Sequence, residues 1–206
     1  MKKLTILSGT AVPWLMPNVD TDIITPMKRI LSAPTKLERY AFEPYRFLGG
    51  DADAGALDPE FPLNKSEYKN AEILIVGENF GGGSSRETAP KAISKMGFRC
   101  IIGSSFGGIF FKNCFQVGIL PITLTKERVE YLAKEAEEGV VFSIDLEQQT
   151  LFVSQDELIH FDVEPLRKTM LLEGLDDVGM TLKEKDNILE FFKKDELKRT
   201  WLYVRK

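Results

Sequence analysis

Cysteine and histidine are scarce in this sequence, which limits the chemistry it can support. Among 206 residues there are two cysteines and one histidine. Cys100 and Cys114 stand in apolar stretches, and their spacing fits neither a CxxC metal pair nor a disulfide framework. We expect both to be reduced core residues. His160 falls in a predicted hairpin strand, where a surface or satisfied role is expected rather than that of a catalytic base. The chain is expected to bind no metal.

Long apolar runs and an excess of positive charge are also missing. Lysine and arginine number 27 against 31 aspartates and glutamates, for a formal net charge of −4. This balance disfavours nucleic acid and anionic lipid as partners, so an anionic ligand must be held by a local site. The N-terminal apolar run is interrupted by Gly, Thr and Pro before it reaches the length of a signal or membrane segment. A cytoplasmic location is expected.

What the sequence does contain is an alternation of strand and helix patterns. Short β-branched segments predict strands at 4–9, 71–77, 98–105, 118–124 and 140–146. Helical spacing predicts helices at 85–96 and 125–138. Two further apolar runs within 150–163 predict a hairpin, which adds an antiparallel edge. The expected fold class is α/β, with a mixed, largely parallel sheet flanked by helices.

Two regions depart from this alternation within what we expect to be one domain over residues 1–206. Residues 32–70 are irregular and rich in proline and aromatics, and so long a loop in a compact domain is usually functional or disordered. The aromatics argue against disorder. At the C-terminal end, a charged helical extension is expected over about 181–206. Its apolar residues Ile188, Leu189 and Phe192 are expected to contact either the domain or a partner.

The segment "GENFGGGSSRETAP", residues 77–90, follows a predicted strand and leads into a predicted helix that begins near Ser84 or Ser85. Such a strand, glycine loop and helix N-terminus can bind anions through free backbone N–H groups and the positive end of the helix dipole. Arg86 adds a planar fork suited to a carboxylate or phosphate. The competing interpretation is a mobile turn in which Ser85 with Glu87 or Thr88 caps the helix.

Several familiar motifs are excluded here by particular residues. A P-loop needs Gly-Lys-Ser/Thr at its end, and a dinucleotide fingerprint needs glycine where Arg86 stands. A nucleophile elbow needs glycine two places after its serine, where Arg86 and Glu87 stand.

Two acidic segments each have more than one possible role. In "NVDTDIITP", residues 18–26, the paired acids either orient a base, bind a metal or only form a turn. Asp176 and Asp177 either have a functional role or cap a helix that begins near Thr181.

Taken together and in order, five segments resemble the small subunit of 3-isopropylmalate dehydratase, a leucine-pathway family related to the swivelling domain of aconitase. The shared segments are "NVDTDIITP", "FEPYRFL", "GENFGGGSSRETAP", "SFGGIFFKNCFQVGILP" and "EGLDDVGMTL". The resemblance implies a single swivelling domain. It also implies a hydro-lyase that moves a hydroxyl between adjacent carbons of a hydroxy dicarboxylate by dehydration and rehydration. A large partner subunit carrying a four-iron, four-sulfur cluster is implied as well, while this chain binds no cofactor.

The resemblance also implies roles for individual residues. Ser84 matches the serine that removes the carbon-bound proton, and Ser85 and Arg86 match ligands of a substrate carboxylate, with Gly83 beside them in the glycine loop. Thr21 and Asp22 match residues of the same cleft that help to order the proton chemistry.

Further residues are expected to contact the substrate. Thr25 matches another hydroxyl of the cleft, and Tyr40–Phe47 match the flexible loop that selects the substrate side chain. A second substrate carboxylate near that loop would need Arg29, Arg39 or Arg46.

The sequence departs from the family pattern at positions around the proposed site. Most members carry Cys, His and Trp where Gly82, Thr88 and Lys91 stand, and an Ala-Asp pair at Gly107-Gly108. These differences leave the substrate open between isopropylmalate and a related dicarboxylate such as homoaconitate, citramalate or dimethylmaleate. A protein of another class, a non-catalytic dicarboxylate-binding protein, is the remaining alternative.

We predict that the isolated chain has no hydro-lyase activity. A helix N-terminus supplies at most about 2 kcal/mol, which lowers the pKa of a serine by only about 1.5 units. Glycine-loop amides, Arg86 and the partner's metal would have to add to this in a closed site. Turnover of isopropylmalate by the purified chain without a large subunit would contradict the prediction.

Overall fold

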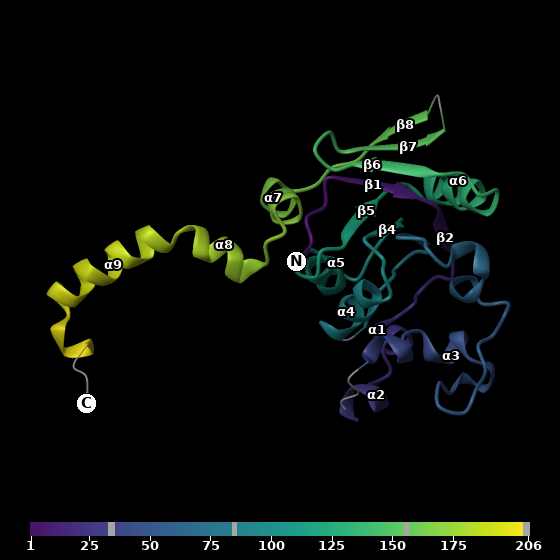
Figure 1. Ribbon diagram of the computed structural model, residues 1–206, viewed down its shortest axis with the longest axis horizontal. Helices are drawn as coiled ribbons and strands as arrows, with labels where there is room; N and C mark the ends of the chain where they lie inside the picture. Colours follow the sequence, from purple (N-terminus) through teal and green to yellow (C-terminus); the bar gives the residue numbers. More distant parts are fainter. Residues whose placement is uncertain (33–35, 84–85, 155–156, 204–206) are drawn as a thin grey trace.

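The computed structural model describes residues 1–32, 36–83, 86–154 and 157–203, and its strands form two sheets (Figure 1). The first is wholly parallel, in the order β2-β3-β4-β5. Its strands are Ala11–Trp14 (β2), Ile73–Val76 (β3), Cys100–Gly103 (β4) and Leu120–Thr123 (β5). The predicted segments 71–77, 98–105 and 118–124 correspond to β3, β4 and β5, and the parallel pairing that the alternation predicted is confirmed for them, whereas β2 was not predicted.

The second sheet is antiparallel, in the order β1-β6-β7-β8. It comprises Ile6–Gly9 (β1), Phe142–Asp145 (β6), Thr150–Ser154 (β7) and Glu157–His160 (β8). The predicted hairpin is β7 and β8, and the exposed His160 lies on the edge strand β8. The predicted strand 4–9 ends at Gly9, and the next strand, β2, belongs to the other sheet.

Proline marks both edges of the parallel sheet. Pro13 lies in β2 and Pro121 in β5, whereas the central strands β3 and β4 are fully buried. A proline has no N–H to donate to a strand ladder, so it is tolerated at an edge and not in the middle of a sheet. The proline positions therefore agree with the strand order.

Helices and the antiparallel sheet cover the two faces of the parallel sheet. Helix α6, Lys126–Glu137, packs with the antiparallel sheet on one face, around Ile73, Ile75 and Leu132. Helices α4, Thr88–Lys95, and α5, Gly108–Gln116, pack on the other face. Helix α4 begins at Thr88, later than the predicted start near Ser84 or Ser85, and no side chain caps it at Glu87.

Between β2 and β3, the described residues 15–32 and 36–72 form short helices and no long one. These are α1 (Thr21–Ile24), α2 (Met27–Leu31) and α3 (Glu43–Arg46), with several 3₁₀ turns. Phe42 and Phe61 pack against Trp14, with ring centroids 5.3 and 5.1 Å from its ring. The aromatic residues thus anchor this irregular region on the domain, as their presence indicated.

A buried carboxylate also holds this region. Glu43 is fully buried, and its oxygens accept hydrogen bonds from Arg29 and from the backbone N–H of Ala52, the latter at 2.9 Å. Arg29 also binds Asp51 at 2.8 Å and Asp53 at 2.5 Å. Burial raises the pKa of Glu43, but these hydrogen bonds and the charges of Arg29 and Lys28 outweigh it, so the pKa lies below its ordinary value.

The C-terminal part of the chain leaves the domain. Helix α7, Pro165–Glu173, packs beside α5, and helices α8, Asp177–Lys183, and α9, Lys185–Lys198, extend away from the body (Figure 1). Asp176 caps α8 by accepting a hydrogen bond from Gly179 N–H at 2.7 Å, so its capping role is confirmed. The helix starts at Asp177 and not near Thr181, because the cap residue precedes the helix directly.

We predict that Glu43→Gln destabilises the protein by about 3 kcal/mol at pH 7, because it removes one partner of a buried ion pair. A carboxylate with a lowered pKa stabilises the fold fully above its ordinary pKa of 4.5, and this stabilisation is lost as the pH falls through the lower folded value. The difference between the two proteins should therefore shrink below about pH 4.5. Urea unfolding at several pH values measures it.

Glu60→Gln is the control, since Glu60 is exposed in the same region and should change the unfolding free energy by less than about 0.5 kcal/mol. A difference between wild type and Glu43→Gln that stays constant from pH 7 to pH 3.5 would contradict the prediction.

Candidate active site

Three loops meet at the carboxyl ends of β2, β3 and β4, where backbone hydrogen bonds continue the parallel pairing. Gly81 N–H donates to Val19 O at 2.7 Å, and Thr21 N–H donates to Gly82 O at 3.0 Å. On the other side, Gly107 N–H donates to Phe80 O at 2.8 Å. The glycine loop is therefore held between its two neighbours. Ligands of open α/β sheets bind at this end of the strands.

Glycine is required at two points of this contact. Gly81 has φ +73°, and a Cβ atom there would overlap the ring of Phe110. A Cβ atom on Gly107 would overlap the carbonyl oxygen of Gly81. The backbones therefore approach more closely than any other residue would allow.

Helix α1 brings the "NVDTDIITP" hydroxyls to the glycine loop. Asp20 caps the helix by accepting a hydrogen bond from Ile23 N–H at 2.8 Å, which is the turn-forming role considered for it. Thr21 and Thr25 are buried, and the Thr25 hydroxyl lies 3.3 Å from the Thr88 hydroxyl. A Cβ atom on Gly83 would lie 3.8 Å from Thr21 Oγ1. The two motifs therefore form one site.

An ion pair between Asp22 and Arg86 joins these motifs. Both terminal nitrogens of Arg86 donate to the carboxylate of Asp22, at 2.6 and 3.0 Å, and one of them lies 3.4 Å from Thr25 O. The Arg86 side chain is 11% exposed and that of Asp22 54%. The hydrogen bond from Arg86 lowers the pKa of Asp22 despite the opposing effect of burial. Asp22 is thus an anion at neutral pH that orients the guanidinium.

The two serines expected at the centre of the site, Ser84 and Ser85, lie outside the described residues. Their neighbours on both sides are described. Gly83 has φ +84° and lies beside Asp20 and Thr21, and Arg86 pairs with Asp22. Gly83 and Arg86 therefore both lie next to α1.

The structure places the other predicted arginines apart from this pair. Arg29 is 14% exposed and is surrounded by Glu43, Asp51 and Asp53, and its pKa is raised, mainly by the hydrogen bond to Glu43. Arg46 donates to Asn64 Oδ1 and Glu38 O, at 3.3 and 3.1 Å. Both side chains hold the irregular segment together in this structure.

The chain's own thiols do not suit an iron–sulfur cluster. Three or four cysteine ligands are needed, and Cys100 and Cys114 are fully buried in different core clusters. Burial raises the pKa of each thiol. Within the described residues, no group of three or more His, Cys, Asp or Glu side chains is placed to hold a metal ion. In the same part of the chain, no helix combines the length and apolarity that crossing a membrane requires.

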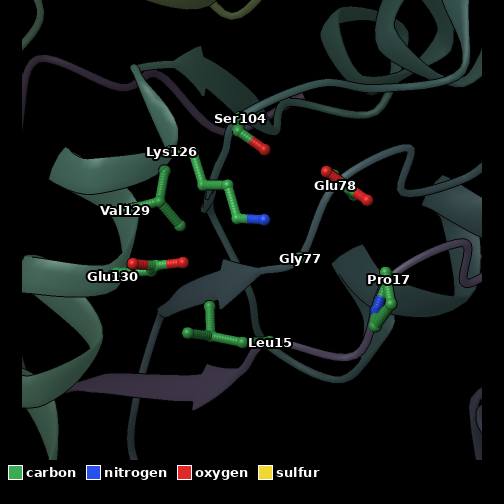
Figure 2. Close-up of a pocket in the computed structure, with 8 residues that line it drawn as sticks. All are labelled: Leu15, Pro17, Gly77, Glu78, Ser104, Lys126, Val129 and Glu130. Atoms are coloured by element: carbon green, nitrogen blue, oxygen red, sulfur yellow. The ribbon is translucent and has the colours of Figure 1, made fainter.

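A separate pocket of about 260 Å³ opens on the α6 side of the same sheet edge (Figure 2). Lys126, Glu78 and Glu130 give it a charged lining above Leu15 and Val129. In Figure 2 the Lys126 side chain extends over Gly77. No residue predicted from the sequence lines this pocket, so it is distinct from the site at the glycine loop.

Residues 1–127, which contain the parallel sheet, the glycine loop and the Asp22–Arg86 pair, match the family described as the aconitase C-terminal domain. The fold is therefore that of an aconitase-type domain.

Two curated relatives and one solved structure are similar to the whole chain. The 3-isopropylmalate dehydratase small subunits of Parvibaculum lavamentivorans and Afipia carboxidovorans are 45% and 41% identical, over 98% of this chain and 100% of each relative. The crystal structure of 3-isopropylmalate dehydratase from Methanocaldococcus jannaschii has a TM-score of 0.64 and 26% identity, covering 90% of this chain and 98% of its own. The chain therefore belongs to the family of 3-isopropylmalate dehydratase small subunits.

Three residues that contribute to the site were not predicted from the sequence to do so. Thr88 was considered as a helix cap and as a departure from the family, yet its hydroxyl faces that of Thr25. Asn18 and Asn79 both have positive φ, and the amide of Asn79 donates to Asn18 Oδ1 at 2.9 Å, which links the two loops. An asparagine next to a glycine-rich turn is the one signal that pointed to this conformation.

We predict that Gly81→Ala destabilises the protein by about 2 to 4 kcal/mol, because the alanine needs a left-handed conformation and displaces the ring of Phe110. Thermal unfolding measures the change. Gly108→Ala is the matched control, since a Cβ atom there meets nothing within 4 Å and alanine favours the helix that starts at this residue. Equal stability of Gly81→Ala and wild type would show that the loop approach is looser than described.

Proposed function

We propose that this chain is the small subunit of a two-subunit hydro-lyase that interconverts 2-isopropylmalate and 3-isopropylmalate, a step of leucine biosynthesis in the cytoplasm. Membership of the family supports the reaction class. The observation that carries the assignment of the site is the Arg86–Asp22 pair, which stands next to the glycine loop where the family's serine is expected. A guanidinium held in this way offers a carboxylate-binding group at the start of α4.

The proposed chemistry divides the roles among the site residues. Ser84 removes a proton from a substrate carbon, a double bond forms to the adjacent carbon, and the hydroxyl departs from that carbon. Water then adds in the opposite sense and gives the isomer. Ser85, Gly83 and Arg86 bind a substrate carboxylate, while Thr21, Asp22 and Thr25 support them. Because the lowered pKa of Asp22 keeps it ionised, we assign it to orienting Arg86 and not to donating a proton.

A large subunit is the proposed partner. The relatives are named as small subunits, and we infer that the partner carries a four-iron, four-sulfur cluster that acts as a Lewis acid on the leaving hydroxyl. This chain supplies the serine, the arginine and the hydroxyls, which must meet the partner's surface at the carboxyl ends of the parallel strands. The closed site then excludes water and strengthens the charged hydrogen bonds.

The arginine network bears on the choice of substrate. Glu43, Asp51 and Asp53 already neutralise Arg29, so a second substrate carboxylate would have to displace one of them. Arg46 is engaged by Asn64 and a backbone carbonyl. This arrangement favours a substrate with an apolar side chain, such as isopropylmalate, over homoaconitate, which brings another carboxylate to this part of the site.

The proposal is tested with the chain and its large subunit combined anaerobically. We expect isomerisation of 2-isopropylmalate with a kcat/KM at least tenfold above that for homoaconitate, citramalate or dimethylmaleate. Ser84→Ala should lower kcat by at least a hundredfold, a loss typical of removing a general base, while substrate binding is retained. Coupled assays and calorimetric titration provide the two measurements.

Ser8→Ala is the matched serine control, because Ser8 is exposed on β1 of the antiparallel sheet and has no part in the proposed site. It should leave kcat unchanged. If Ser84→Ala retained full turnover, Ser84 would not be the base. If the wild-type pair bound a dicarboxylate but turned over none of the four compounds, the chain would belong to the non-catalytic alternative.

A further inference from the structure

Exposed apolar side chains are concentrated in the C-terminal arm, which we define as residues 177–203. Of the 21 large apolar side chains that stand exposed among the described residues, eight lie in this arm. They are Val178, Leu182, Leu189, Phe191, Phe192, Leu197, Trp201 and Leu202. So many exposed apolar groups on one element indicate an interaction surface.

The arm leaves the domain in a fixed direction. Lys183 pairs with both carboxylate oxygens of Glu173 at 2.8 Å, and Asp177 N–H donates to Gln116 at 3.3 Å. These contacts tie α8 to α7 and α5. Beyond them, α9 extends away from the body of the domain (Figure 1). The "GLDD" segment, which the proposed chemistry does not use, thus builds the junction that directs the arm outward.

The end of the arm is folded upon itself. Asp195 is 8% exposed and accepts hydrogen bonds from Arg199 Nε at 2.6 Å and from the Tyr203 hydroxyl at 2.8 Å. This contact holds the 3₁₀ turn Thr200–Leu202 against α9 and leaves Trp201 68% exposed. The arm therefore presents an ordered apolar surface.

Electrostatic attraction does not explain this surface. Residues 177–206 contain eight lysines and arginines and six aspartates and glutamates, an excess of only two positive charges. Anionic membranes and nucleic acids are bound chiefly by excess positive charge. The arm therefore suits an apolar protein groove better than either of these partners.

The width of the apolar stripe on α9 distinguishes between a second copy of this chain and a different protein as the partner. Around α9, the stripe runs from Leu189 through Phe192 and Ile188 to Phe191, about 160° at 100° per residue. If α9, which is about 21 Å long, packed against α9 of a second copy of this chain, only part of a stripe of this width would be covered. A groove that encloses the helix covers the whole stripe.

A cleft connects the root of the arm with the candidate active site. Its volume is about 470 Å³, and it runs from the residue after Arg86 to the start of α8. Its walls include Glu87, Lys91, Gln116, Arg167, Asp176 and Asp177. A partner that covers the active site can therefore continue along this polar cleft to the apolar arm.

We propose that the C-terminal arm docks into an apolar groove of the large subunit, so that the subunit interface extends from the glycine loop along the cleft to α9. This inference rests on the proposed function, because the large subunit is the protein that must cover the site. The arm then contributes to subunit affinity and takes no part in the chemistry.

The test uses the full chain and the anaerobically reconstituted large subunit of the same organism. Phe191→Ala/Phe192→Ala removes apolar area while favouring the helix, and Lys193→Ala/Lys194→Ala is the neighbouring control pair. We expect the phenylalanine variant to raise the Kd for the large subunit about 10- to 100-fold, and the control less than about 3-fold. At saturating large subunit, kcat should equal that of wild type. Thermal unfolding of each isolated chain should be unchanged.

Three outcomes would overturn the inference while leaving the proposed function intact. In one, the wild-type pair is active and the phenylalanine variant binds equally well. In another, sedimentation shows that this variant loses self-association of the isolated chain and keeps its affinity for the large subunit. In the third, wild-type chain binds lipid vesicles through Phe191 and Phe192. An inactive wild-type pair would instead overturn the proposed function.

Discussion

The close approach of three backbone loops at the end of the parallel sheet is the constraint on which the site depends. Gly81 and Gly107 allow the loops to pair as if the strands continued beyond their last residues. The sheet consequently fixes the positions of the helices that begin or end at these loops, which are α1, α4 and α5. Buried strands β3 and β4 lie directly beneath, so the position of Arg86 relative to Asp22 is set by the most protected part of the domain.

Carboxylates position the arginines on both sides of α1. Asp22 holds Arg86 in a bidentate pair, and Glu43 with two further acids holds Arg29. The two pairs differ in burial. Glu43 is fully buried, while Asp22 is about half exposed. Losing Glu43 would leave Arg29 without its buried partner, whereas Asp22 remains in contact with solvent while it orients Arg86. The first pair therefore holds the irregular segment together, and the second holds a guanidinium in place next to the glycine loop.

Much of the fold followed from local pattern, and the failures have physical reasons. Buried β-branched strands and the amphipathic helix α6 were predictable because their periodicity reflects burial directly. The division of the strands into two sheets was not predictable. It depends on a change of chain direction at Thr10, and no residue type there requires such a change. Helix α5, "GIFFKNCFQ", is apolar on most sides and lacks a clear period. At the site, the glycine loop and Arg86 were predictable as a carboxylate-binding turn. The Asp22–Arg86 pair was not predictable, because its residues are 64 positions apart in the sequence and meet only in the tertiary structure.

Proline at both edges of the parallel sheet has a consequence for the chain before it finds a partner. Because Pro13 and Pro121 have no N–H to donate from the edge strands β2 and β5, another copy cannot extend the parallel sheet through a continuous row of donors. Pairing of two copies through the edges of this sheet is thus disfavoured in newly made chains that carry an exposed apolar arm. At this sheet, association is left to side-chain surfaces, which can discriminate between partners in a way that a bare backbone edge cannot.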